Sequence, residues 1–402
     1  MRRERCLICE SNNLAKILDL GNHAYADTFI SKKRFYDCLS VYNLSCALCL
    51  DCGQIQTISK TSPEDRYSLH DYSYTSSNSK TSRTHWENYA NRICKKLKIQ
   101  KNDFVVEIGS NDGFLLQCFE NNDLKVLGVD ASRYVAKLAY EKNINTIIGL
   151  FDTEISDKII RESSYAKLVV ANNVFNHSED PVSFAESAFN LLEDDGYFVF
   201  ELPYWKNSID SQKIDQVYHE HVSYFTAKSS KKIMEKCGFS IIDIEVVDYH
   251  GGSLRVYAQK KTNEEIKHCD KLYSFIENES YLFVLDTYNS LKKDLLKRKN
   301  ALNKHLFDLK SKGIPIIAIG AAAKGNTSLT FLSLGNTIID YVTDTSIHKQ
   351  NKFTPLTNIP IVDDNILSSY DEVCALILSW NLSETIKEKL RKINTKIKFL
   401  EF

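Results

Sequence analysis

Four cysteines near the start of the chain form two C-x-x-C turns: Cys6, Cys9, Cys49 and Cys52. Two such turns supply four thiolates in a tetrahedral arrangement, which is the ligand set of a structural zinc ion. Gly53 directly follows the second turn and permits the positive φ that bends backbone N–H groups toward sulfur. Cys46 is the alternative ligand, because it forms an overlapping C-x-x-C with Cys49. The spacing predicts a closed zinc site.

Other uses of these cysteines fit the sequence less well. The chain has 11 cysteines, an odd number, whereas a secreted disulfide framework has an even number in a small chain. A redox C-x-x-C is expected inside a βαβ pattern, which does not surround these residues. A set of unrelated buried thiols is the structural alternative.

The segment 104–113 (FVVEIGSNDG) reads as a strand that ends at Ile108 and turns into a helix. Gly109 and Gly113 bracket this turn, and the start of the helix offers free N–H groups. A dinucleotide-binding loop has the spacing G-x-G-x-x-G, which is absent here. Glu107 and Asp112 instead suit a cationic ligand, and S-adenosylmethionine carries an amine and a sulfonium.

Polar residues at later strand ends extend this candidate site. Asp130 ends the second strand, where a carboxylate can accept both ribose hydroxyls. Asp152 follows the third strand as a candidate acceptor for the adenine amine, and Asn172 ends the fourth. The order of these features resembles the class I S-adenosylmethionine-dependent methyltransferases. That resemblance implies a set of cofactor-binding residues: Glu107, Gly109, Asn111, Asp112, Gly113, Asp130, Asp152 and Asn172. A degenerate Rossmann-like nucleotide-binding domain is the alternative.

Two clusters rich in His, Tyr and Asn lie on the same side of the predicted sheet. Residues 172–177 (NNVFNH) begin at the end of the fourth strand, and residues 218–225 (YHEHVSYF) follow the fifth. Histidine titrates near neutrality and can take and return a proton, and a neighbouring carboxylate can orient its ring. A metal site is disfavoured, because residues two apart point to opposite faces of an extended chain. An aromatic core with capped histidines is the structural alternative.

The elements that must position these residues suggest three units within 402 residues. Residues 1–70 are rich in cysteine and form a predicted small zinc-binding domain. In residues 71–262 strands alternate with helices, which predicts a mostly parallel sheet covered on both faces. Residues 263–402 begin with a charged helical stretch and continue as a smaller α/β domain, with a loop over 320–327 and a helix from Ser328. The predicted fold class is α/β with a central, Rossmann-like class I methyltransferase domain.

The whole chain resembles the sugar C-methyltransferases that build branched deoxysugars. The resemblance rests on the joint order of several motifs: Cys6-x-x-Cys9, LDLG at 18–21, Cys49-x-x-Cys52-Gly-x-x-Gln, EIGSNDG at 107–113, YHEH at 218–221, GGSLR at 251–255 and GAAAKG at 320–325. It implies methyl transfer to the carbon next to the ketone of a nucleotide-linked 4-keto-6-deoxy sugar. A ketone makes that proton acidic through an enolate, so a base and groups that stabilise the oxyanion are required.

The same resemblance implies roles for the His and Tyr residues. His221 is the candidate base, with Glu220 as its partner, and either His221 or Tyr218 takes the proton. Tyr218 and His177 are expected to contact the sugar or its ketone oxygen. The Ser- and Tyr-rich stretch 71–82 is either a linker or a loop over the active site, and Tyr72 is the candidate lid residue in it. Tyr74 fits that role equally well by spacing.

The C-terminal loop GAAAKGNT at 320–327 offers small residues through which backbone N–H groups can approach a diphosphate. Lys324 adds positive charge, and the loop is not a Walker A sequence. The candidate substrate-binding residues are Lys324, Asn326, Asp344, Lys349 and Arg255. The alternatives are a turn that only stabilises the fold, a solvated loop at Asp344 and Lys349, and a solvated arginine at the edge of a strand.

The overall charge argues against a protein whose main task is to bind nucleic acid. The chain has 51 Lys and Arg against 52 Asp and Glu, for a net charge of -1. No apolar run reaches the ~20 residues that span a bilayer, and no apolar core follows the first charged residues. We therefore expect a cytoplasmic protein, no membrane or nucleic-acid partner, and a monomer. The alternative functions are O- or N-methylation of a nucleotide sugar, a zinc-containing RNA-modifying methyltransferase, and a scaffold with a vestigial cofactor pocket.

Overall fold

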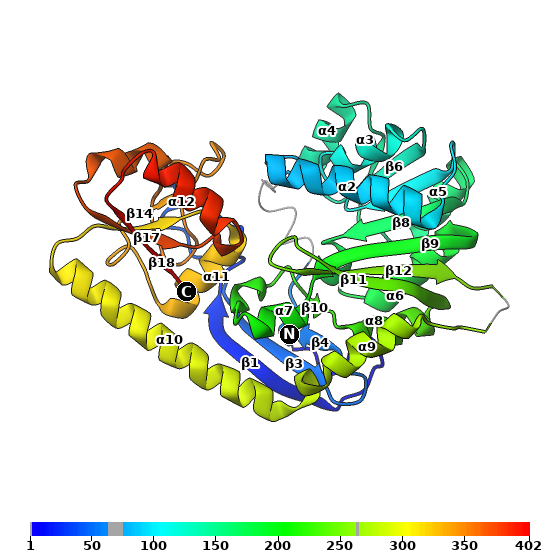
Figure 1. Cartoon of the computed structure of the whole chain (residues 1–402), viewed down its shortest axis with the longest axis horizontal. Coiled ribbons are helices and arrows are strands. Elements are labelled where there is room, and N and C mark those ends of the chain that lie inside the picture. The colour runs from blue at the N-terminus through cyan, green and yellow to red at the C-terminus, as the bar shows by residue number, and fades with distance from the viewer. Residues whose placement is uncertain (1, 63–74, 263–264) are drawn as a thin grey trace.

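The computed structural model describes residues 2–62, 75–262 and 265–402. Figure 1 shows a central α/β unit on one side and a C-terminal α/β unit on the other. The N-terminal strands and the long helix α10 (Leu285–Ser311) run beneath both units and connect them. Among the described residues, no helix is both long enough and apolar enough to cross a membrane.

The central unit contains a seven-stranded sheet in the order β11-β12-β9-β8-β5-β6-β7. Strands β7, β6, β5, β8 and β9 pair in parallel in that order, whereas β9, β12 and β11 pair in antiparallel fashion. The strands are β5 (Phe104–Ile108), β6 (Lys125–Asp130), β7 (Thr146–Ile148), β8 (Ala166–Asn172), β9 (Leu192–Pro203), β11 (Phe239–Val247) and β12 (Ser253–Lys260). The predicted fold class is confirmed, because β6, β5 and β8 form the parallel centre of the sheet.

Helices cover both faces of this sheet because strand residues alternate between two apolar cores. Val105 of β5 packs with α2 (Lys80–Leu97) and α3 (Phe114–Glu120), whereas its neighbour Val106 faces the opposite core. The opposite core contains buried residues of four helices: α5 (Thr153–Glu162), α6 (Pro181–Leu191), α8 (Ala227–Lys236) and α9 (Asp270–Asn278). Helix α4 (Arg133–Glu141) packs on α3 through Ala139. Because α9 belongs to this core, the central unit extends beyond residue 262, where the sequence analysis placed its end.

The N-terminal sheet has the order β1-β3-β4-β10 and takes its last strand from the central unit. Its strands are β1 (Leu14–His23), β3 (Tyr42–Cys49), β4 (Ile55–Thr57) and β10 (Ser223–Tyr224). The N–H of Thr57 donates to the carbonyl of Val222 at 2.9 Å, which adds to this pairing. The segment 218–225 is therefore held by the cysteine-rich unit, a contact that the sequence analysis did not predict.

The C-terminal unit has an all-parallel sheet in the order β16-β14-β13-β17-β18. Its strands are β13 (Ile316–Ile319), β14 (Tyr341–Thr343), β16 (Ile361–Val362), β17 (Val373–Ile377) and β18 (Ile397–Glu401), and its helices include α11 (Ala323–Leu332) and α12 (Ser383–Arg391). Helix α11 begins at Ala323, five residues before the predicted start at Ser328, so Lys324 lies in its first turn. Strand β15 (Lys352–Phe353) pairs with β2 (Ile30–Ser31) of the N-terminal unit.

Candidate active site

The turn between β5 and α3 has the backbone that its glycines suggest. Gly109 adopts φ +73°, and a Cβ there would lie 2.8 Å from the side chain of Val174. The N–H of Gly109 donates to the carbonyl of Val129 at 2.7 Å. Gly113 adopts φ +75° at the N-cap of α3, where no side chain caps the helix. The turn therefore needs glycine at both positions.

Asp130 fixes this turn from the neighbouring strand. One carboxylate oxygen accepts the N–H of Asn111 at 2.9 Å, and the other accepts the N–H of Ser132 at 2.8 Å. Burial raises the pKa of Asp130, although these two hydrogen bonds oppose the shift. Each carboxylate oxygen can accept a further hydrogen bond, so contact with a ribose is still possible.

Glu107 is the residue of this turn that most needs a cationic ligand. Its side chain is buried, and its Oε2 atom forms no hydrogen bond with any described residue. Burial, with the negative charges of Asp112 and Asp130, raises the pKa of Glu107 well above its usual value. A buried acceptor without a partner costs about 1–3 kcal/mol, which a cationic donor would recover. The residues therefore fit the ammonium and sulfonium of S-adenosylmethionine.

Asp112 differs from Glu107, and its predicted contact with a cationic ligand is corrected here. Its carboxylate pairs with Lys142 at 2.9 Å and accepts hydrogen bonds from the hydroxyls of Ser76, at 2.5 Å, and Ser77. Although burial opposes them, these partners lower the pKa of Asp112. The N–H of Ser76 also donates to Oδ1 of Asn111 at 2.9 Å. Asp112 therefore holds the segment before α2 against the cofactor turn.

The other predicted cofactor residues occupy different surroundings. Asp152 is exposed and caps α5 by accepting the N–H of Ile155 at 2.9 Å. Asn172 ends β8 opposite Glu201 of β9, with its side-chain nitrogen and oxygen buried. Tyr72 and its alternative Tyr74 lie outside the described residues.

The segment 218–221 places a phenol against an imidazole. The hydroxyl of Tyr218 lies 2.6 Å from Nε2 of His221, and Nδ1 of that ring lies 2.8 Å from the carbonyl of Gln216. A carbonyl only accepts, so Nδ1 carries the proton and Nε2 accepts from the phenol. Burial lowers the pKa of His221 to about 4, and the charge of Lys324 adds to this effect. The ring is therefore neutral at pH 7.

Glu220 does not orient this ring, contrary to the sequence analysis. Both nitrogens of His221 are already occupied by Gln216 and Tyr218, so no ring N–H is left for a carboxylate. A main-chain carbonyl has taken the role expected of Glu220. Sequence reasoning missed Gln216 because a backbone acceptor leaves no signature in residue type.

His177 completes the group on the other side of His221. It lies in the short helix η2 (Phe175–His177), and its ring centroid is 5.2 Å from that of His221. The N–H of Val222 donates to the carbonyl of Asn176 at 2.9 Å and joins the two segments. The structure thus brings together three of the five predicted catalytic residues, Tyr218, His221 and His177.

The four predicted zinc ligands also meet in space. Their sulfur atoms all lie within 4.8 Å of one another, with Cys6 3.5 Å from Cys52 and Cys9 3.6 Å from Cys49. Thiolates at ~2.3 Å from a tetrahedral zinc lie about 3.8 Å apart, so the cluster fits the ion. Cys46 is not a ligand, because it points into a separate apolar core.

The predicted substrate-binding residues of the C-terminal unit fall into two groups. Lys324 donates to Oδ1 of Asn381 and lies 4.9 Å from the centroid of the Trp380 ring. Burial lowers the pKa of Lys324 to about 8, although Asp215 opposes the shift. Asp344 accepts the N–H groups of Ala321 and Ser346, both at 2.8 Å.

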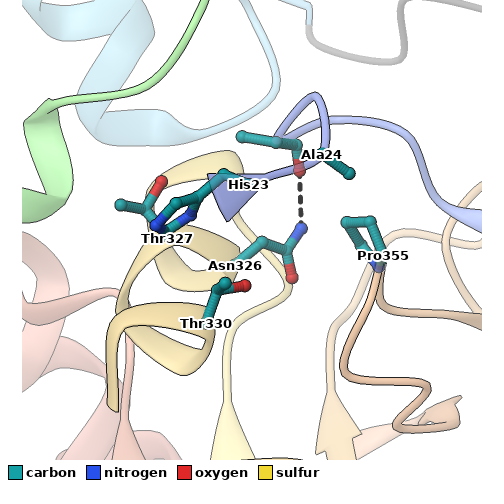
Figure 2. Close-up of a pocket in the computed structure, with 7 residues that line it drawn as sticks. His23, Ala24, Asn326, Thr327, Thr330 and Pro355 are labelled. Carbon is teal, nitrogen blue, oxygen red and sulfur yellow. Dashed lines mark hydrogen bonds between the residues drawn. The ribbon is translucent and has the colours of Figure 1, made fainter. Parts of the chain in front are cut away.

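Lys349 and Asn326 bind backbone carbonyls near the same turn. Lys349 donates to Ala321 at 2.7 Å, and Asn326 donates to the carbonyl of Ala26 at 2.6 Å. Figure 2 shows Asn326 and Thr330 of α11 around a small cavity that His23 of the N-terminal unit also lines. This corrects the expectation for Asn326, whose amide joins two units of the chain.

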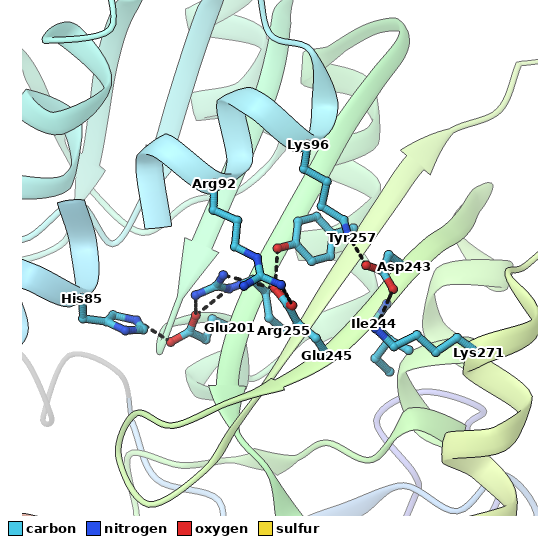
Figure 3. A network of polar contacts seen from close by, with 10 residues as sticks. All are labelled: His85, Arg92, Lys96, Glu201, Asp243, Ile244, Glu245, Arg255, Tyr257 and Lys271. Carbon is cyan, nitrogen blue, oxygen red and sulfur yellow. Dashed lines mark hydrogen bonds and ion pairs between the residues drawn. The ribbon is translucent and has the colours of Figure 1, made fainter. Parts of the chain in front are cut away.

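The expectation that Arg255 contacts a phosphate is also corrected, because two buried carboxylates already balance its charge. Its side chain is buried and pairs with Glu201 at 2.6 Å and with Glu245 at 3.2 Å. His85 binds the other oxygen of Glu201 at 2.8 Å. Figure 3 shows this network between α2 and the antiparallel edge of the sheet. Two carboxylates on neighbouring strands neutralise the guanidinium, which is a structural role.

Comparison with known families gives three matches in sequence order. Residues 6–67 match a zinc binding domain, residues 82–244 match a methyltransferase domain, and residues 248–400 match a C-methyltransferase C-terminal domain. The C-methyltransferase NovU of Streptomyces niveus is 25% identical over 399 residues, which is 99% of this chain and 93% of NovU.

Solved structures match a smaller part of the chain. The magnesium protoporphyrin IX methyltransferase ChlM of Synechocystis, with bound SAH, has 14% identity and a TM-score of 0.36, and covers 44% of this chain and 83% of that one. The CurJ carbon methyltransferase has 15% identity and a TM-score of 0.35, and covers 45% of this chain and 54% of that one.

The matched domains agree with the geometry described above. The four-thiol cluster lies inside the matched zinc binding domain, and the β5–α3 turn lies inside the matched methyltransferase domain. The predicted cofactors, S-adenosylmethionine and zinc, are confirmed. The chain is an enzyme that transfers methyl groups, and its three matched domains and its similarity to NovU agree with a C-methyltransferase that carries a zinc-binding N-terminal domain.

Proposed function

We propose that this enzyme methylates the carbon next to the ketone of a nucleoside-diphosphate-linked 4-keto-6-deoxy sugar. The observation that carries the proposal is the Tyr218–His221 pair, whose 2.6 Å hydrogen bond and carbonyl-fixed ring form an acid–base dyad. Carbon is a poor nucleophile until it loses a proton, so a C-methyltransferase needs such a base next to its methyl donor. S-adenosylmethionine supplies an electrophilic methyl group when bound at the β5–α3 turn.

The hydrogen bonds of the dyad suggest how the proton moves. Only Nε2 of His221 can accept a proton, since Nδ1 already carries one for Gln216. Nε2 faces the hydroxyl of Tyr218, so we expect the phenol oxygen to take the proton from carbon while its own proton passes to Nε2. The electron pair of the broken C–H bond moves to the ketone oxygen and forms the enolate. The proposed relay uses both Tyr218 and His221, the two residues between which the sequence left the choice of base open.

Two groups near the dyad, His177 and Lys324, are the ones that we propose to favour that enolate. The ring of His177 is 5.2 Å from that of His221, close enough for both to line one substrate. Lys324 acts electrostatically on His221 from the C-terminal unit. Positive charge near a developing oxyanion lowers the barrier to enolate formation.

The C-terminal turn is the part that we propose for the nucleoside diphosphate. Gly320 adopts φ +93°, and the start of α11 has no side-chain cap. Free N–H groups at a helix start attract phosphate, and Lys349 lies beside Ala321 in the same turn. The nucleotide would then bind opposite the methyl donor, with the sugar between the two units.

The test uses labelled methyl donor and a panel of nucleotide-linked keto sugars. We expect label on carbon, and exchange of the α-proton with solvent deuterium when the donor is left out. His221→Asn is expected to abolish the exchange and to leave donor binding intact. His305→Asn, at an exposed position on α10, is the matched control. Exchange that survives His221→Asn would eliminate the dyad as the base, and label on oxygen or nitrogen would overturn C-methylation.

A further inference from the structure

Trp380 of the C-terminal unit contacts the segment that precedes the Tyr218–His221 dyad. This residue begins the short helix η6 (Trp380–Leu382), three residues after the carboxyl end of β17 (Val373–Ile377). Its indole Nε1–H donates to Oδ2 of Asp215 at 2.7 Å. Asp215 is buried in the short helix η3 (Ile214–Gln216) of the central unit, and the residue that follows it is Gln216.

The same indole ring also packs on the turn between β11 and β12. A Cβ at Gly251 would lie 2.0 Å from Cη2 of Trp380, so the ring rests directly on the glycine backbone. The residue before it, His250, accepts a hydrogen bond from Nε2 of Gln216 at 3.0 Å. Trp380 therefore contacts both supports of Gln216, namely Asp215 on one side and the 250–251 turn on the other.

Gln216 in turn determines which ring nitrogen of His221 carries the proton. Its carbonyl accepts Nδ1–H of His221 at 2.8 Å, which leaves Nε2 free to accept from Tyr218. A small shift of this carbonyl would release the alternative tautomer, in which Nε2 carries the proton and cannot act as a base. Catalysis depends on such placement, and a displacement of ~1 Å can cost about a hundredfold in rate.

We propose that Trp380 is a positioning residue for methyl transfer, which holds Gln216 through Asp215 and the 250–251 turn and so fixes the tautomer of His221. The inference rests on the proposed role of the dyad. Two lysines strengthen the contact between Trp380 and Asp215. Lys324 and Lys213 lie 4.9 and 5.2 Å from the centroid of the Trp380 ring, and both favour the charged form of Asp215. The C-terminal unit then contributes to the chemical step as well as to substrate binding.

The test replaces Trp380 by Phe, which removes the Nε1–H and keeps an aromatic ring over Gly251. We expect kcat to fall by about tenfold to a hundredfold, with KM for the nucleotide sugar and for the donor within twofold. Trp86→Phe is the matched control, because Nε1 of Trp86 has no hydrogen-bond partner among the described residues. An unchanged kcat in Trp380→Phe would overturn the proposal.

Nitrogen-15 NMR of the imidazole provides a readout that needs no substrate and that a purely structural role would not change. We expect wild type and Trp86→Phe to show one Nδ1–H tautomer at His221, and Trp380→Phe to show a mixture of tautomers. A single tautomer in all three proteins would overturn the proposal even if kcat fell. If wild type fails to methylate keto sugars, the proposed function fails, while this arm still tests Trp380.

Substitution of Asp215 completes a double-mutant cycle. Asp215→Asn keeps an oxygen acceptor for the indole and is expected to preserve most of kcat, whereas Asp215→Leu removes the acceptor. Because Trp380→Phe and Asp215→Leu break the same hydrogen bond, their combined loss is expected to equal the larger single loss. Losses that multiply would show that Trp380 and Asp215 act separately, against the proposal.

Discussion

The central and C-terminal units contain turns of similar backbone. In the central unit Gly109 follows β5, and its N–H donates to the carbonyl of Val129 on the neighbouring strand. In the C-terminal unit Gly320 follows β13, and its N–H donates to the carbonyl of Thr343 at 2.8 Å. In each unit an aspartate after that neighbouring strand accepts the N–H of a turn residue and the N–H two residues beyond itself: Asp130 and Asp344. In both sheets the strand before the turn is the middle one of five strands that pair in parallel, and the strand that ends at or next to the aspartate lies beside it.

The charges of the two turns are opposite. Two residues before Gly109 stands Glu107, whose buried Oε2 atom has no hydrogen-bond partner among the described residues, and two residues before Gly320 stands Ala318. The C-terminal turn instead has Lys349 on its backbone and Lys324 in the helix that follows. Two turns of similar backbone thus differ in their neighbouring side chains, which agrees with the proposal that the first binds a cationic methyl donor and the second a diphosphate. A few side chains set the ligand class.

Loss of zinc is expected to have the largest effect, since the N-terminal unit pairs with strands of both other units. It binds the central unit through β4 and β10 and the C-terminal unit through β2 and β15. Chelation, or Cys9→Ser, is expected to lower methyl transfer by more than about a hundredfold, because a structural zinc contributes directly to folding. Elemental analysis, activity and circular dichroism provide the measurement, with Cys38→Ser, an exposed cysteine, as control. Full activity in zinc-free protein would contradict this expectation.

Removal of the charge of Glu107 is expected to affect only the central turn. Glu107→Gln should weaken binding of S-adenosylmethionine by about tenfold to a hundredfold, as expected for a hydrogen bond to a charged group. Calorimetry should show nucleotide binding unchanged. Because the pKa of Glu107 is raised and the donor is cationic, wild-type affinity should increase as the pH rises through that pKa. Equal donor affinity in wild type and variant would show that Glu107 does not face the donor.

Substitution of the two equivalent aspartates compares the turns directly. Asp344→Asn loses one acceptor oxygen, which costs about 1 kcal/mol, or about fivefold in an equilibrium. We expect it to weaken binding of nucleoside diphosphate and not of donor, and Asp130→Asn to do the reverse. Should both variants weaken the same ligand, the two turns would not serve separate ligands.

At pH 8, the pH dependence of substrate binding gives the smallest effect. Lys324 has a pKa lowered to about 8, so it is protonated below that pH and loses its charge above it. KM for the nucleotide sugar is expected to rise about twofold at pH 8 and about tenfold at pH 9, while donor affinity stays level. Lys324→Arg keeps its charge to higher pH, so the rise in KM at high pH should disappear in this variant. A rise in KM that persists in that variant would be due to another titrating group.

The sequence predicted features that depend on neighbours along the chain. The zinc turns, the Gly109 turn and the alternation of strands and helices all have short spacings of recognisable residue types. Errors arose where distant groups decide the outcome: Lys142 neutralises Asp112, and Glu201 and Glu245 neutralise Arg255 across strands. The start of α11 was placed late because its small residues resemble a loop, although alanine and lysine favour helix.

The pairing of β10 with β4 has a consequence for how this protein can be divided. The strand that follows the catalytic segment finds its partner more than 160 residues earlier in the chain, across a boundary that sequence comparison would treat as a module border. A fragment cut to contain only residues 82–244 would keep the β5–α3 turn and lose the strand that pairs with β10. We therefore expect residues 218–221 to be held less firmly in that fragment than in the full chain, and a graft of this domain to need the cysteine-rich unit with it.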